Sequence, residues 1–189
     1  MATPDVSTLT LQDVVISGKG SKTASIQCGR KEAVLTIQAP VAFEPSAYGD
    51  SEKTAARVNL VLRPCEQDVE WLSELDEWVI STVAKDATKY FGKQRSAEQI
   101  RESYTPSIRD SEKYSATFKG KINLEGSGRV KIWDDEGQPR DAPEVWKEAM
   151  IRARIKVKGL WFMGANSFGI TFETTDVKVL EEPTLECPL

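Results

Sequence analysis

Residues 151–162 read Ile-Arg-Ala-Arg-Ile-Lys-Val-Lys-Gly-Leu-Trp-Phe. Successive side chains of a β-strand point to opposite faces of its sheet. The alternation therefore predicts a strand with one apolar face and one cationic face, and the cationic face carries Arg152, Arg154, Lys156 and Lys158. These cations would repeat every ~6.6 Å, which is two strand rises of ~3.3 Å each. That repeat is close to the phosphate spacing of an extended polynucleotide.

Two aromatic residues follow the cationic row directly. Trp161 and Phe162 offer flat surfaces on which unpaired bases stack. By strict alternation Phe162 shares the cationic face and Trp161 the apolar face, unless Gly159 permits a bulge. The alternative interpretation is an amphipathic strand whose basic solvent face protects a sheet edge from aggregation.

The overall composition limits the classes of function. The chain has 189 residues, which suits a single domain, here residues 1–189, with a sizeable core. Its net charge of -4 and pI of about 5.1 argue against coating nucleic acid through bulk charge. A local basic face can still bind nucleic acid, because binding depends on the field at the site. Without an apolar run of membrane-spanning length or a signal peptide pattern, we expect a soluble intracellular protein of the cytoplasm or nucleus, with no membrane partner.

The chemistry-bearing residue types argue against an enzyme. Histidine is absent, which excludes histidine-based nucleophilic catalysis and histidine-ligated metal sites. The three cysteines are too scattered for a disulfide framework or a zinc site. Asp134, Asp135 and Glu136 could hold a divalent cation as in a nuclease, but they precede Gly137 in a predicted turn, where Asp is favoured for backbone reasons. We expect no enzymatic activity and no cofactor or metal.

The expected elements run in the order strands, helices, strands. The predicted strands span residues 8–16, 33–39, 57–62, 116–124, 129–133, 150–158 and 168–180. Apolar residues at spacings of three and four predict one amphipathic helix over 68–90. Ser96 and Gln99 predict the capping box of a shorter helix. One further helical turn is expected at 143–148. A mainly β fold with an inserted helical segment, about 67–104, fits an OB-fold-like antiparallel barrel better than a βαβ scheme.

The outward faces of the C-terminal strands predict a binding patch, if these strands are neighbours in one sheet. Its candidate residues are Lys119, Lys121, Arg129, Lys131, Trp133, Arg152, Arg154, Lys156, Lys158, Trp161 and Phe162. The cations would neutralise phosphates, and the aromatic rings would stack unpaired bases, which a duplex does not offer. We therefore expect sequence-independent binding of single-stranded DNA. The alternative is a structural or scaffolding β-protein whose basic face binds an acidic protein partner.

Several segments also carry a family resemblance. They are residues 58–64 followed by the acidic start of the long helix, the strand region 115–133, the run from Asp134 to Pro139, and Gly159-Leu160-Trp161-Phe162 with the segment 164–170. In these segments the chain resembles the single-stranded DNA-binding proteins of T7-type phages and similar proteins of large DNA viruses. The resemblance spans about residues 55–182. It implies an OB-fold with an inserted helix, single-stranded DNA binding in replication and recombination, and a homodimer.

The C-terminus departs from this family. The phage proteins end in a long acidic tail that contacts replication partners, whereas the short tail here, about 181–189, holds only Glu181, Glu182 and Glu186 as acids. Replication proteins are therefore partners implied by the resemblance, and the departure weakens that implication. Neither the residues nor the resemblance separates DNA from RNA.

Overall fold

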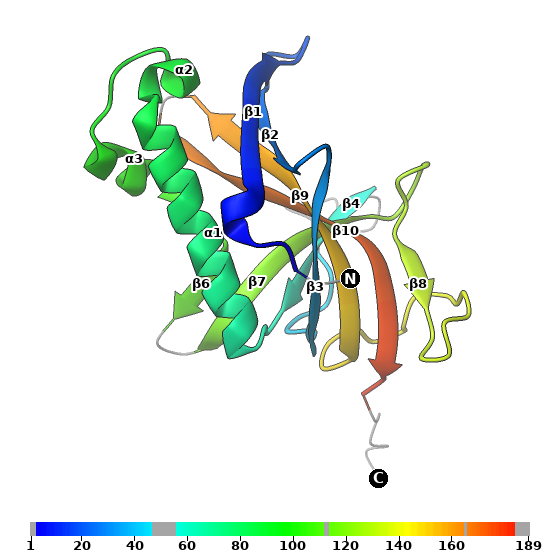
Figure 1. The fold of residues 1–189 in the computed structure, drawn as a ribbon. Helices are drawn as coiled ribbons and strands as arrows, with labels where there is room; N and C mark the ends of the chain where they lie inside the picture. The colour runs from blue at the N-terminus through cyan, green and yellow to red at the C-terminus, as the bar shows by residue number, and fades with distance from the viewer. Residues whose placement is uncertain (1–2, 47–55, 112–113, 165, 184–189) are drawn as a thin grey trace. The chain divides into compact units, whose positions relative to one another are not determined.

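The computed structural model describes residues 3–46, 56–111, 114–164 and 166–183. The fold is mainly β with an inserted helical segment, as expected. The chain divides into two compact units: residues 1–35, 66–109 and 156–172 form the first, and residues 36–65, 110–155 and 173–189 form the second. The long strands β3 (Lys31–Pro40), β9 (Met150–Met163) and β10 (Ser167–Glu181) contribute residues to both units (Figure 1). Most of the expected C-terminal tail lies outside the described residues.

The strands of the first unit begin with a hairpin. A short 3-10 helix, η1 (Val6–Thr8), leads into β1 (Leu9–Ile16), which pairs antiparallel with β2 (Lys22–Cys28). β2 in turn pairs antiparallel with the end of β9, and β5 (Tyr104–Thr105) runs parallel to the start of β10. The sequence did not predict β2, because only Ala24 and Ile26 supply its buried face.

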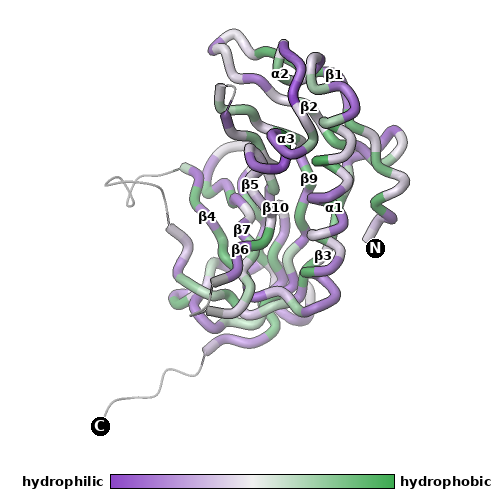
Figure 2. The backbone as a smooth tube through the Cα atoms, turned by 90° about the vertical axis from the view of Figure 1, so that its left-hand side faces the viewer, coloured by the Kyte–Doolittle hydropathy of each residue, from purple (hydrophilic) through white to green (hydrophobic). Residues whose placement is uncertain are grey.

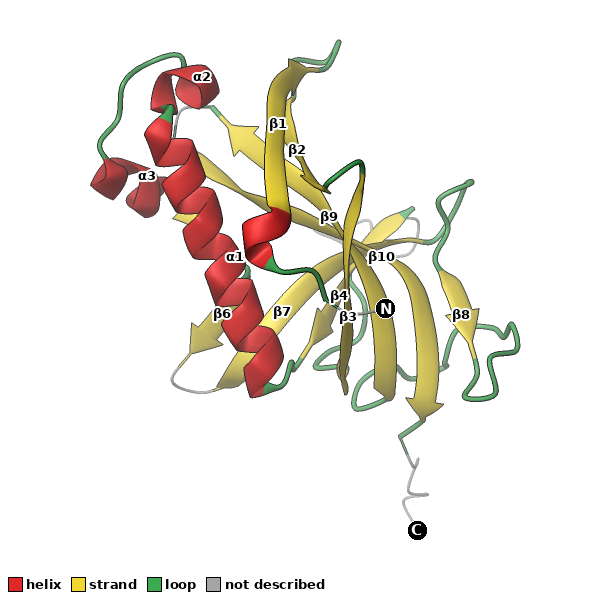
Figure 3. Ribbon diagram, viewed as in Figure 1, coloured by secondary structure: helices red, strands yellow, loops and turns green. Residues whose placement is uncertain are grey.

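Three helices complete the first unit (Figure 3): α1 (Glu66–Lys85), α2 (Ala87–Phe91) and α3 (Ala97–Ser103). Hydrophobic and hydrophilic positions alternate around α1 (Figure 2), and its apolar stripe is buried. The prediction of one continuous helix over 68–90 is wrong, because Asp86 leaves the helical conformation and caps α2 by accepting a hydrogen bond from the Lys89 backbone N–H. Gly92 ends α2 at a φ of 72°, and the predicted capping box of Ser96 and Gln99 opens α3.

A buried carboxyl group ties α1 to the segment that follows α3. Asp76 accepts hydrogen bonds from the Tyr104 hydroxyl at 2.5 Å and from the Ser107 hydroxyl and backbone N–H at 2.5 and 2.8 Å. Burial raises the pKa of the Asp76 carboxyl group, and the hydrogen bonds from Ser107 and Tyr104 oppose that rise. Tyr104 also packs edge-on against Phe168, with ring centroids 5.1 Å apart.

The second unit is built from β4 (Arg57–Leu62), β7 (Tyr114–Asn123), β8 (Lys131–Trp133) and the remaining parts of the long strands. β4 pairs antiparallel with β7 over their full common length. β10 pairs in parallel with β7 at Glu173 and Lys121, and with β8 from Asp176 to Lys178. The short strand β6 (Ile108–Ser111) pairs with β7. Parallel and antiparallel pairs thus occur together.

The helical turn predicted at 143–148 is wrong. The Glu44 carboxylate accepts hydrogen bonds from the backbone N–H groups of Trp146, at 3.0 Å, and of Lys147, at 2.8 Å. Glu148 adopts a φ of 68° and forms a two-point ion pair with Arg63 at 2.7 and 2.8 Å. A side chain about a hundred positions away therefore replaces the local hydrogen bonds of a helix, which no local pattern reveals.

Candidate nucleic-acid interface

The alternation predicted for β9 is present in the structure. Ile151, Ala153, Ile155 and Val157 are buried, whereas Arg152, Arg154 and Lys158 are exposed and Lys156 is half-buried. The strand therefore carries its cations on the face opposite the core.

The alternation changes phase at Gly159. This residue has a φ of 138°, and a Cβ atom placed on it would lie 2.2 Å from the carbonyl oxygen of Ala24 on β2. Leu160 is buried next to its register partner Ala24, whereas Gly159 pairs with the exposed Ser25, so Lys158 and Gly159 share the outer face although Gly159 itself is covered by β2. The alternation thus changes phase at Gly159 in the manner of a β-bulge, and every later side chain moves to the other face.

The bulge reverses the faces expected for the two aromatic residues. Phe162 is half-buried and packs against an aromatic cluster of the first unit, with its ring centroid 6.2 Å from Tyr90, 5.6 Å from Phe91 and 5.8 Å from Phe168. The ammonium group of Lys22 lies over the same ring, 5.5 Å from its centroid. The strict alternation that placed Phe162 on the cationic face is therefore wrong. Three aromatic rings and the Lys22 ammonium group contact the Phe162 ring, so its main observed role is packing.

Trp161 takes the outward position instead. Its side chain is half-exposed, and its indole Cζ2 atom lies 3.0 Å from where a Cβ of Gly169 would be. The missing side chain of Gly169 thus lets the indole approach the β10 backbone. Trp161 combines a supported position with partial exposure, the properties required of a base-stacking platform.

The cations of β9 differ in their partners. The Arg152 guanidinium donates from Nε and Nη2 to the Gln38 side-chain oxygen at 3.1 and 2.8 Å, which orients the group without neutralising it. Within the second unit Arg154 lies 3.7 Å from a carboxylate oxygen of Asp176. Within the first unit Lys156 lies 2.7 Å from Glu32. Each of these ion pairs has one well-exposed partner, so water screens it and the cation stays available to another anion.

The β4–β7 pair presents further cations in the second unit. Lys119 is half-buried and Lys121 is exposed, on the face opposite Phe118 and Ile122. Loss of hydration and the nearby Arg57 guanidinium lower the pKa of the Lys121 ammonium group. Arg57 thus lies close to the predicted cations, although we did not predict it as a binding residue. The alternation of residues 57–62 was the signal that could have identified it.

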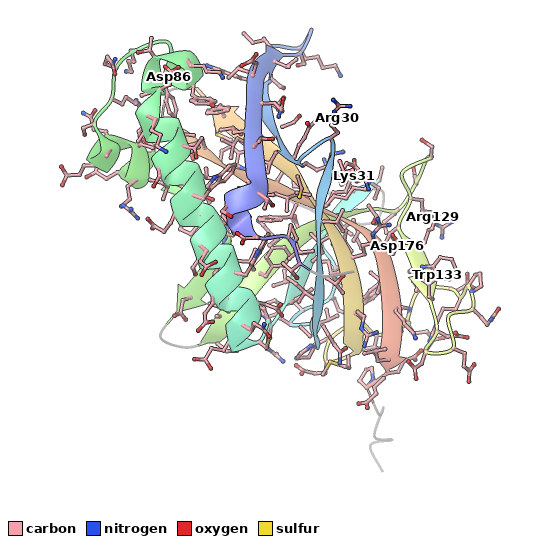
Figure 4. The ribbon with its side chains drawn as sticks, viewed as in Figure 1. Arg30, Lys31, Asp86, Arg129, Trp133 and Asp176 are labelled. Carbon is pink, nitrogen blue, oxygen red and sulfur yellow. The ribbon has the colours of Figure 1, made fainter. Side chains whose placement is uncertain are left out.

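β8 adds an aromatic residue beside further cations. Figure 4 shows Trp133 on β8 next to Asp176 on β10, with Arg129 just before the strand. Trp133 is half-exposed and donates from its indole Nε1 to Asp176 Oδ1 at 3.4 Å. Lys131 is exposed and is the register partner of Asp176. Residues 129–133 and 139–142 line an open pocket of about 380 Å³ beside this strand.

An acidic strand interrupts the predicted patch. In the second unit β10 lies between β9 and β7, and it carries Glu173 and Asp176 on half-exposed positions. Phe172 and Thr174 are buried, and so are Val177 and Val179, so the alternation of β10 changes phase between these pairs. The predicted patch therefore includes an acidic strand between its basic ones in this unit, and its binding role stays a prediction. The basic strands are neighbours of an acidic one, and we had not predicted Asp176 as a site residue.

The acidic run considered for metal binding forms a turn. The Asp134 carboxylate accepts a hydrogen bond from the Gln138 backbone N–H at 2.7 Å, and the Asp134 carbonyl accepts from Gly137 at 3.1 Å. Among the residues that the structure describes, no group of three or more Cys, Asp or Glu side chains is arranged to hold a metal ion. Within the same residues, no helix has the length and apolar character to cross a membrane.

The fold belongs to the OB-fold-like class with a helical insertion. The single-stranded DNA-binding protein gp2.5 encoded by bacteriophage T7 has a similar structure, with a TM-score of 0.53 and 12% sequence identity over 82% of this chain and 90% of that chain. The single-stranded DNA-binding protein from bacteriophage Enc34, in complex with single-stranded DNA, matches with a TM-score of 0.45 and 13% identity over 92% and 93% of the two chains. The sequence matches none of the curated proteins. The chain belongs to a family of unknown function, DUF5871, whose model matches residues 50–188.

Proposed function

We propose that the protein binds single-stranded DNA without sequence preference and acts in DNA replication, as a distant structural counterpart of the phage proteins. Its cations neutralise phosphates and its outward indoles stack unpaired bases. In the second unit the proposed contacts are Lys119, Lys121, Arg129, Lys131, Trp133, Arg152 and Arg154. In the first unit they are Lys156, Lys158 and Trp161, and Phe162 is assigned a packing role.

The observation that carries this proposal is the outward cationic face of β9. Four cations alternate with four buried apolar residues, so the strand is anchored by its inner face while the outer one faces solvent. The half-exposed Trp133 and Trp161 add aromatic surface to the second and the first unit, respectively. Likeness in fold to the gp2.5 protein of bacteriophage T7 supports the same conclusion.

The test is fluorescence anisotropy with labelled oligo-dT, titrated at several salt concentrations beside a duplex of equal length. We expect tight, salt-sensitive binding to oligo-dT and much weaker binding to the duplex. Absence of binding to oligo-dT at low salt would refute the proposal and favour an acidic protein as the partner of the basic face. An oligo-U strand of equal length decides whether RNA is bound as well.

A charge-removal experiment locates the binding face. Replacing Arg152 and Arg154 by alanine should lower the slope of log K against log salt by about 0.7 for each lost phosphate contact. The matched control is the double variant Lys85→Ala with Lys147→Ala, which removes the same charge from exposed positions on α1 and in a loop. A slope that stays equal to that of the wild type in the arginine variant would remove β9 from the interface.

The resemblance also implies partners other than DNA. We propose replication proteins and a second copy of the chain as such partners. Size-exclusion chromatography with light-scattering detection would measure the molar mass and so establish whether the chain is a dimer.

A further inference from the structure

Asp176 occupies the centre of a small cluster in the second unit. Its carboxylate lies 3.7 Å from the Arg154 guanidinium, accepts a hydrogen bond from the Trp133 indole at 3.4 Å, and accepts another from the Thr175 hydroxyl at 2.8 Å. Lys131 is its register partner on β8. The carboxylate is thus flanked by a cation on each neighbouring strand.

The local backbone holds Asp176 in this position. The alternation of β10 changes phase between Thr174 and Val177, which are both buried, so Thr175 and Asp176 are consecutive half-exposed residues. Without that phase change, residue 176 would face the core, where an ionised carboxyl group is strongly disfavoured. The backbone of β10 itself therefore directs the Asp176 carboxylate away from the core.

The groups around the Asp176 carboxylate, two cations and an indole, are ones that would also contact a phosphate and a base of single-stranded DNA. A carboxylate and a phosphate are both anions with oxygen acceptors, and both accept hydrogen bonds from guanidinium groups. The Arg154 side chain is 47% exposed and that of Asp176 is 25% exposed, so water screens their pairing and the pair is easily opened. Once Arg154 turns to a phosphate, however, the carboxylate stays nearby and repels the polyanion.

We propose that Asp176 is a competing carboxylate that weakens single-stranded DNA binding by occupying Arg154 and Trp133 in the free protein. This inference rests on the proposed function, since it names the internal competitor at the same face. Asp176 limits affinity, so that DNA is bound reversibly and is released by moderate salt.

The decisive variant is Asp176→Asn. Its amide oxygen can still accept from the Trp133 indole, while the negative charge is lost. A unit charge 4 Å from a phosphate in water opposes binding about fivefold, so we expect an affinity for oligo-dT about fivefold higher than that of the wild type. The gain should shrink as salt is added, because screening removes the repulsion. Asp176→Glu keeps the charge and should show no such gain.

The matched control is Asp135→Asn, which removes an exposed acid that pairs with Lys178 at 3.4 Å in the same unit. We expect this variant to change the affinity less than twofold. Thermal unfolding of each variant verifies that it is folded, and Asp176→Ser provides a second neutral variant if Asp176→Asn is not.

Three outcomes separate the inference from the function on which it rests. The inference is supported if Asp176→Asn and Asp176→Ser bind oligo-dT more tightly than the wild type while Asp176→Glu and Asp135→Asn do not. A wild type that binds oligo-dT together with neutral variants that bind equally or more weakly overturns the inference and leaves the proposed function intact. A wild type that binds no oligo-dT at low salt overturns both.

Discussion

Replacing Gly159 by alanine tests whether a bulge sets the outward position of Trp161. An alanine there must adopt a φ of 138°, and its Cβ would lie 2.2 Å from the Ala24 carbonyl oxygen and 2.7 Å from Ser25 Cα. The first effect costs about 1–2 kcal/mol for an L-residue outside its preferred regions. The second forces β2 and β9 apart, and overpacking of this kind costs about 1–3 kcal/mol more. We therefore expect Gly159→Ala to lower the free energy of unfolding by about 2–5 kcal/mol.

Gly20→Ala is the matched control in the same unit. Gly20 has a φ of 78°, and a Cβ there meets no atom within 4 Å. Both variants place a side chain at a positive φ and change the unfolded-chain entropy equally, so their difference reports the close approach of β2 together with the greater strain of alanine at 138° than at 78°. Urea denaturation should show Gly159→Ala to be less stable than Gly20→Ala by about 1–3 kcal/mol. Equal stability of the two variants would refute the bulge as the cause of the phase change.

Two further predictions concern the whole fold. Burial raises the pKa of the Asp76 carboxyl group, so the folded state binds its proton more tightly than the unfolded state does. The stabilisation from this proton is complete below the pKa of Asp76 in the unfolded state and is lost as the pH rises through its pKa in the folded state. Lowering the pH from 7 towards 4 should therefore raise the unfolding free energy of the wild type relative to that of Asp76→Asn. A difference between the two proteins that does not change with pH would contradict this prediction. Because β3, β9 and β10 contribute residues to both compact units, we propose that residues 1–189 form one domain. We expect circular dichroism and tryptophan fluorescence to report the same single unfolding transition. Two separated transitions would show that the units unfold independently.

The sequence predicted the elements whose signal is local. The cationic alternation of residues 151–158 and the capping box at Ser96 depend on neighbours within a few positions, and both are present in the structure. Asp86 breaks the predicted long helix although the apolar spacing continues through it, because its side chain offers the backbone another hydrogen-bond partner. Glu44 replaces a predicted helical turn from about a hundred residues away. Such contacts depend on tertiary structure, which periodicity does not encode.

The arrangement of the candidate interface differs from the one expected from strict alternation, and two phase changes explain the difference. Alternation assigns faces only while a strand remains regular, and one extra residue reverses every later assignment. At Gly159 the reversal turns Trp161 to the outer face and Phe162 towards Tyr90, Phe91 and Phe168, and Gly159 itself was the visible signal. In β10 the reversal between Thr174 and Val177 has no glycine to mark it, so the outward position of Asp176 could not be foreseen.

These two phase changes act on the proposed interface in opposite directions. The first adds an indole to a cationic strand face, which strengthens stacking with unpaired bases. The second adds a carboxylate beside Arg154, which weakens attraction for phosphates. A protein with a net charge of -4 repels a polyanion except where cations dominate locally. Under the proposed function, binding therefore depends on stacking as well as on charge, and this would favour single strands, whose bases are free, over duplexes, which offer phosphates alone.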